Sequence, residues 1–171
     1  MSVADELLVD AFGRVKEAVH GVVEGLTGEE LTYRVDPDAN TIAWLVWHLT
    51  RIQDDHVAAL AGTEQTWLRD GWVDRFALPF SRKAHGYGHS SHDVAAVDVA
   101  GDLLLGYHDA VHDQTLAYVK GLGDEEYAEI IDRRWDPPVT RAVRLVSVVE
   151  DDLQHVGQAA FVRGVVKRRP K

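Results

Sequence analysis

The sequence contains no cysteine, and no apolar run approaches the roughly 20 residues that cross a membrane. The lack of cysteine excludes disulfides, thiolate metal sites and a cysteine nucleophile. A bound transition metal would therefore use histidine, aspartate or glutamate. Residues 1–6 contain neither a basic segment nor an apolar segment, so we expect no secretory signal, no membrane association and a cytoplasmic location.

Basic residues are also scarce, with 18 Lys and Arg against 28 Asp and Glu and a net charge of −10. An acidic surface repels phosphate backbones, so we expect no nucleic-acid partner. The one basic run, 167–171, is predicted to be a solvated chain end. Neither a Gly-x-Ser-x-Gly elbow nor a glycine-rich phosphate loop is present, which makes nucleophilic alternatives weak.

Four stretches carry the three- and four-residue apolar spacing that is typical of long helices. Asn40 or Thr41 can cap the second of them, and Ser90 with Asp93 has the spacing of a capping box for the third. The expected helices cover residues 5–26, 41–61, 90–122 and 140–167.

The segment 63–91 is rich in aromatic residues and is long for a structureless loop, so we expect a functional cover or short helices there. We find no internal repeat and no strand-like alternation strong enough to predict a sheet. The predicted fold is all-α, a four-helix bundle in one domain over 1–171, with a long crossover loop between the second and third long helices.

His48 and the pair Asp151 and His155 are the most informative residues, because they lie about 100 residues apart in two strongly helical stretches. Residues four apart share one face of a helix, so Asp151 and His155 can act together. With a histidine from a facing helix they would form a three-ligand metal site with open positions. The alternatives are a hydrogen-bonded core histidine and a surface carboxylate paired with Arg144 or Arg163.

Two features of the pattern compete with this assignment. A helical wheel places Asp152 nearer than Asp151 to the centre of the apolar face, and spacing alone does not choose between them. His108 and His112 have a His-x3-His spacing that suits zinc, although acidic neighbours make a solvated polar face equally natural. His85, His89 and His92 lie in the loop as surface histidines, of which His89 could reach over a site.

The segments NTIAWLVWHL at 40–49 and DDLQHVGQ at 151–158 resemble the DinB-like superfamily, and the resemblance extends over residues 1–168. The related proteins are uncharacterised actinobacterial ones, the metal-binding domain of mycothiol-dependent maleylpyruvate isomerase, and bacillithiol transferases. The resemblance implies a four-helix bundle with a divalent metal, zinc or nickel. The implied ligands are His48, Asp151 in place of the family's histidine or glutamate, and His155. The isomerase carries a further C-terminal domain, so its own activity is not expected here.

The resemblance also implies an activity. We expect a metal-dependent S-transferase that acts on a small-molecule substrate with a low-molecular-weight thiol such as mycothiol, because a metal lowers the pKa of a bound thiol. Trp67, Tyr87 and His89 are expected to cover the site and contact the substrate. The alternatives are a metal-dependent hydrolase on the same site and a non-catalytic metal- or ligand-binding bundle, with a homodimer as the expected assembly.

Overall fold

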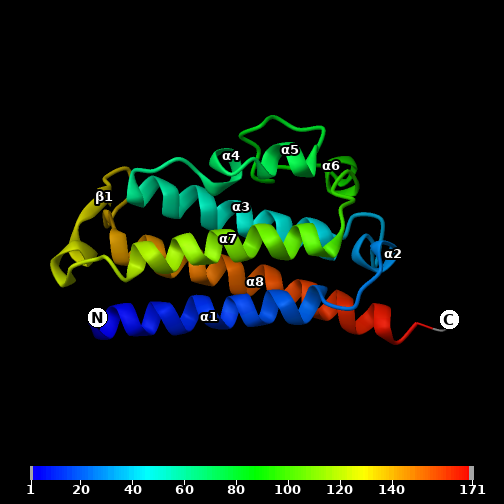
Figure 1. Ribbon diagram of the computed structural model, residues 1–171, viewed down its shortest axis with the longest axis horizontal. Helices are drawn as coiled ribbons and strands as arrows, with labels where there is room; N and C mark the ends of the chain where they lie inside the picture. The colour runs from blue at the N-terminus through cyan, green and yellow to red at the C-terminus, as the bar shows by residue number, and fades with distance from the viewer. Residues whose placement is uncertain (1, 170–171) are drawn as a thin grey trace.

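Four long helices form the framework of the protein and lie along a common axis (Figure 1). They are α1 (Val3–Val23), α3 (Ile42–Ala61), α7 (Gly101–Val119) and α8 (Arg141–Lys167). The structure is a computed structural model that describes residues 2–169. It confirms the predicted all-α bundle, and no helix in the described range is long and apolar enough to cross a membrane.

The helices run in two directions along the bundle. Figure 1 shows α1 and α8 running one way and α3 and α7 the other. The α3 helix packs against α7 and α8, and α1 packs against the same two helices from the opposite side. Because α3 and α7 are parallel, the intervening residues 62–100 must return along the whole bundle, which confirms the expected crossover.

The crossover contains three short helices: α4 (Thr66–Arg69), α5 (Trp72–Phe76) and α6 (Ser91–Ala95). The predicted capping box forms, since the Ser90 side chain accepts a hydrogen bond from the Asp93 backbone, but the helix that it starts ends after five residues. The single third helix predicted over 90–122 is therefore wrong at its beginning. Ala96 forms a turn, residues 97–100 are not helical, and Val97 is fully buried in the core.

The other elements lie at the two ends of the bundle. They are the short helix α2 (Gly28–Leu31), the 3-10 helix η1 (Asp124–Ala128), and the antiparallel strands β1 (Ile130–Asp132) and β2 (Val139–Thr140). The sequence analysis predicted no sheet, and strands of three and two residues are too short to show alternation.

The basic end of the chain was predicted to be solvated, and its described residues 167–169 are exposed, although two of them also contact the protein. Lys167 forms an ion pair with Glu30, and the Arg169 guanidinium lies over the Tyr33 ring. The last two residues of that run, 170 and 171, lie outside the described part, as does residue 1 of the predicted 1–171 domain.

Buried polar side chains fasten the crossover to α3. Arg51 is fully buried, and its Nε donates to the Ala84 carbonyl while Nη1 donates to the Tyr107 hydroxyl. Asp54 accepts hydrogen bonds from the backbone N–H groups of residues 66 and 67 and from Tyr107. A buried charge that lost these partners would be costly, so the network holds the crossover firmly over one face of α3.

Candidate metal centre

His48 lies on the buried face of α3, and its hydrogen bond shows which ring nitrogen carries the proton. Its Nδ1 donates to the His85 carbonyl, because a carbonyl oxygen can only accept. The Trp44 ring, one helical turn earlier, stacks on the imidazole at 4.6 Å. Burial lowers the pKa of His48 to about 4, so at neutral pH the Nε2 lone pair is free to bind a metal.

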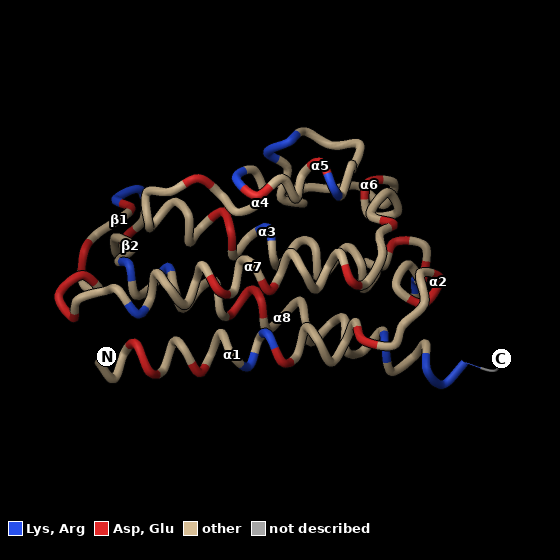
Figure 2. Tube along the Cα trace, in the orientation of Figure 1, with Lys and Arg blue, Asp and Glu red and all other residues tan. Residues whose placement is uncertain are grey.

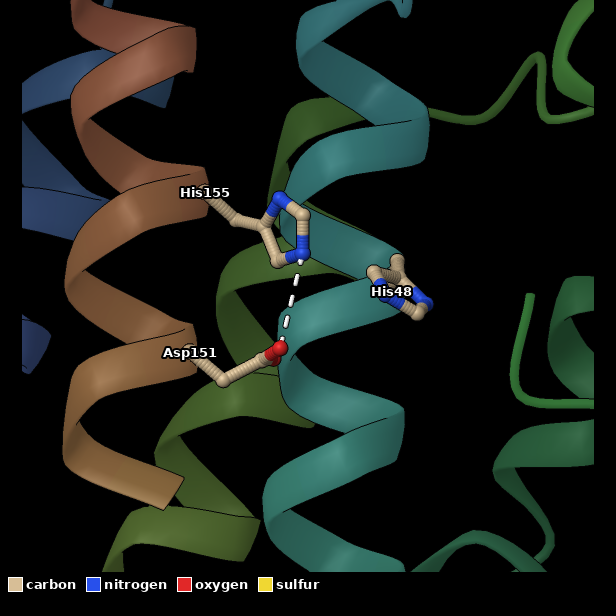
Figure 3. A group of neighbouring side chains, drawn as sticks. All are labelled: His48, Asp151 and His155. Atoms are coloured by element: carbon tan, nitrogen blue, oxygen red, sulfur yellow. Dashed lines mark ion pairs between the residues drawn. The ribbon is translucent and has the colours of Figure 1, made fainter. Parts of the chain in front are cut away.

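Asp151 and His155 reach toward α3 from consecutive turns of α8 (Figure 3). His155 Nε2 lies 3.6 Å from Asp151 Oδ1, and its Nδ1 lies 3.2 Å from the Gln158 amide oxygen, to which it can donate. The Asp151 Oδ2 atom is buried and has no hydrogen-bond partner. Burial raises the pKa of Asp151, while His155 and then His56 act in the opposite direction.

These three residues form one compact group of potential ligands. One ligand atom of each lies within 4.8 Å of the other two, and the His48 and His155 ring centroids are 4.8 Å apart. Two imidazoles and a carboxylate suit a divalent transition metal, and a cation would satisfy the unpartnered Asp151 oxygen. The donor set and its geometry therefore fit a divalent metal.

The loop segment that closes over His48 depends on Gly86. This glycine has a φ of +98°, and a Cβ there would lie 2.6 Å from His48 Nδ1 and 3.1 Å from atoms of Trp44 and Trp47. Only glycine permits both the backbone conformation and the close approach. The role of Gly86 could not be predicted from the sequence, since it depends on a contact with a residue 38 positions earlier.

The three residues expected to contact substrate are placed differently from one another. The His89 ring lies 4.5 Å from Phe80 and 5.6 Å from Trp47, and its Nδ1 accepts a hydrogen bond from the Trp44 indole, which places it beside the candidate centre. Tyr87 is 88% exposed and Trp67 only 3%. Trp67 thus belongs to the core beneath the crossover, and contact with substrate stays a prediction for all three.

Asp152, the competing ligand, points into the core. Its side chain is fully buried, as the helical wheel indicated, and neither carboxylate oxygen has a hydrogen-bond partner. Burial raises the pKa of Asp152 well above its ordinary value, which favours the neutral acid. The metal-compatible group includes Asp151 rather than this residue.

The rival histidine pair lies on α7. His108 and His112 are buried, and their ring centroids are 6.5 Å apart. The neighbouring Asp109 is bound instead to His20 of α1, at 2.8 Å. Within residues 2–169, no further histidine or carboxylate turns this pair into a three-ligand group.

Comparison with known proteins gives two findings. The model of a family described as Mycothiol-S-transferase matches residues 7–167. A crystal structure of a conserved protein from Enterococcus faecalis matches with a TM-score of 0.91 and 31% sequence identity, over 99% of each chain. The comparison with curated proteins gave no match. The family match at residues 7–167 includes the positions of the three residues of the candidate metal centre.

Proposed function

Since the chain belongs to the mycothiol-S-transferase family, in agreement with its DinB-like sequence, we propose that it is a divalent-metal-dependent transferase of a low-molecular-weight thiol. The observation that carries the proposal is the group formed by His48, Asp151 and His155, whose ligand atoms come within 4.8 Å of one another from two facing helices. In both imidazoles the Nδ1 atom has a hydrogen-bond partner, which leaves Nε2 available.

In the proposed site, His48 Nε2, His155 Nε2 and an Asp151 oxygen would hold a divalent metal. When bound, zinc or nickel supplies Lewis acidity that lowers the pKa of a coordinated thiol and so provides a nucleophile at neutral pH. The His85 carbonyl and the Gln158 amide fix the orientation of the two imidazoles, as partners of metal-binding histidines generally do. The reacting sulfur must come from the thiol substrate, because the chain has no cysteine.

Three protein ligands favour a catalytic site over a purely structural one. Structural zinc sites usually have four protein ligands, whereas three leave a position for a substrate. The Asp151 side chain is 34% exposed, so the group can be reached from solvent. This accessibility supports a transferase rather than the non-catalytic binding bundle that the sequence also allowed.

The aromatic residues beside the centre have a proposed role in excluding water. Trp44 contacts both imidazoles of the candidate site, with ring centroids 4.6 Å from His48 and 6.5 Å from His155. His89 accepts the indole hydrogen on Nδ1, so its own proton is on Nε2 in the neutral form. We propose that this N–H donates to the substrate. The dimer and the cytoplasmic location stay predictions.

The test is thiol transfer by the purified protein, with mycothiol as the thiol and monochlorobimane as the electrophile. A chelator should abolish the transfer, and added zinc or nickel should restore it. Asp151→Asn should lower kcat/KM and metal affinity by about tenfold or more, whereas Glu150→Gln, on an exposed neighbour in the same helix, should change neither.

Two results would contradict the proposal. One is full transfer by protein shown to be metal-free by elemental analysis. The other is metal-dependent hydrolysis of ester substrates without any thiol transfer, which would favour the hydrolase alternative on the same site.

A further inference from the structure

A cavity of about 460 Å³ lies where α8 begins, further along the seam between α3 and α8. Its polar lining comes from Arg134, Arg141, Arg144, His56 and Asp132, and apolar side chains of α3 and β1 form the rest of its wall. In Figure 2 basic segments lie around β1, β2 and the start of α8. Such a cluster is notable in a chain whose net charge is −10.

Two of the three arginines already have carboxylate partners. Arg134 binds Asp132 at 2.8 Å. Arg141 binds Glu129 at 2.5 Å and donates to the Leu60 carbonyl at 3.2 Å. The Arg141 contacts join the start of α8 to the segment before β1 and to the end of α3, whereas the Arg134 pair is local and its guanidinium is 86% exposed.

Arg144 differs, because it has no carboxylate of its own. Its Nη1 donates to His56 Nδ1 at 3.1 Å, a neutral acceptor whose pKa is lowered by burial and by Arg144 itself. Its Nη2 is 3.9 Å from Asp132, which already binds Arg134. The Arg144 side chain is only 23% exposed, so a largely desolvated cation is left with incomplete neutralisation.

The position of Arg144 in α8 adds to this imbalance. Arg141 and Arg144 lie within the first four residues of a 27-residue helix, and the first turn contains no acidic residue. The N-terminus of a helix carries a partial positive charge, so cations there are unfavourable and an anion would be favourable. Arg141 is stabilised by its contacts with Glu129 and Leu60, whereas a bound anion would complete the neutralisation of Arg144.

The cavity lies along the same pair of helices as the candidate metal centre. His56 follows His48 by eight residues on α3, and Arg144 precedes Asp151 by seven residues on α8. At 1.5 Å per residue, these separations correspond to about 10 to 12 Å along the same seam. His56 and Asp151 are close enough to influence each other's pKa.

We propose that this cavity binds the carboxylate of a substrate whose reacting end lies at the metal centre. The ligand class is a monocarboxylate with a hydrocarbon body, since Ala59, Leu60 and Ile131 supply the apolar wall. A carboxylate suits the one guanidinium of the cluster that lacks a close carboxylate partner, that of Arg144. The second charge of a phosphate would face Asp132. The catalytic meaning of this subsite rests on the proposed transferase function, but the binding itself does not.

The test measures the binding of benzoate to the full chain by calorimetry, with benzamide as the uncharged control. Arg144→Met should weaken benzoate binding by about tenfold or more, and benzamide should bind wild type more weakly than benzoate by a similar factor. Arg163→Met, on the same helix but bound to the Val22 carbonyl, should bind benzoate as wild type does. Benzoate should also shift the NMR resonances of the His56 ring in wild-type protein, a readout that needs no variant.

Two outcomes would overturn the proposal: equal benzoate affinity of wild type and Arg144→Met, or stronger binding of inorganic phosphate than of benzoate. Benzoate should still bind to chelated protein and to Asp151→Asn. If benzoate binds in this way but the protein holds no metal, the carboxylate subsite stands and the transferase proposal fails. If the protein holds metal but does not bind benzoate, the subsite proposal alone fails.

Discussion

The molecule contains two groups of histidines on different helices, each with at least one buried ring, and they differ in their partners. Burial lowers the pKa of His48 to about 4 and that of His108 to about 3, so both are neutral at physiological pH. His48 donates from Nδ1 to a carbonyl and presents Nε2 to Asp151 and His155. Neither ring nitrogen of His108 has a partner. Burial and a lowered pKa therefore do not by themselves mark a metal site.

The difference comes from the facing helix. His108 and His112 have a His-x3-His spacing, but α1 supplies His20 to Asp109 and no third ligand to the pair. The α8 helix, in contrast, presents a carboxylate and an imidazole to α3 at the level of His48. A metal site in a bundle thus depends on donors from two helices that meet at the same level.

The largest expected effect is the loss of bound metal when His48 is substituted. His48→Ala should remove essentially all bound zinc or nickel, because two ligands on one helix are left to hold the ion. His108→Leu should retain the wild-type stoichiometry. Elemental analysis of both purified variants is the measurement. Equal metal content in His48→Ala and wild type would show that the ion, if any, is bound elsewhere.

The next effect concerns the support of His48. Gly86→Ala should weaken metal binding by about 10- to 100-fold, because its Cβ would displace the loop that fixes the imidazole. Gly88→Ala is the matched control: Gly88 also has a positive φ, of +76°, but its Cβ would meet no atom within 4 Å. A competitive titration with a metal indicator compares the two. Similar losses of metal affinity in both variants would show that the effect comes from backbone strain and not from the contact with His48.

The pH dependence of stability should reveal the contribution of His108, in the second group of histidines. The pKa of His108 is about 3 in the folded protein against 6.5 for the ordinary group, so below about pH 6.5 the unfolded chain binds the proton and the folded chain does not. Stability should therefore fall as the pH decreases from 6.5, by about 1.4 kcal/mol per unit for this residue. His108→Leu should lower that slope by about 1.4 kcal/mol per pH unit, the contribution of one bound proton.

Urea unfolding of chelated protein between pH 7 and 4.5 measures the effect, because metal release then does not contribute. An unchanged slope in His108→Leu would show that this histidine already binds a proton in the folded state, or that it is not buried.

The smallest effect concerns the second imidazole of the centre. Gln158→Ala should weaken metal binding by at most about tenfold, since the bond from His155 to Gln158 is exposed and such bonds contribute about 0.5–1.5 kcal/mol. Gln154→Ala, on the same helix, serves as control. The same indicator titration measures the effect. A loss of metal affinity larger than that of Gly86→Ala would show that Gln158 contributes more to metal binding than the loop at Gly86 does.

Much of the bundle could be predicted from local signals. Thr41 caps α3 by accepting from the Trp44 backbone, and Thr140 caps α8 in the same way. The start of α7 could not be predicted, because its N-cap residue Ala100 makes no side-chain hydrogen bond. Arg51 and Asp54 were also missed as crossover anchors, since their partners are brought together only by the fold.

The candidate site was predictable in part. Spacing placed Asp151 and His155 on one face, but the choice of Asp151 over Asp152 came from family resemblance, while the wheel correctly indicated the deeper burial of Asp152. The His85 carbonyl and Gly86 carry no local signal, because their role depends on a loop that returns to α3. Backbone groups that orient a ligand are in general invisible to side-chain patterns.

The most direct test of the account is an anomalous-scattering map from crystals of metal-loaded protein, recorded at the absorption edge of the metal. We predict one strong peak within about 2.0–2.2 Å of His48 Nε2, His155 Nε2 and an Asp151 oxygen. A peak at His108 and His112, or no peak between α3 and α8 in protein that contains stoichiometric metal, would contradict it.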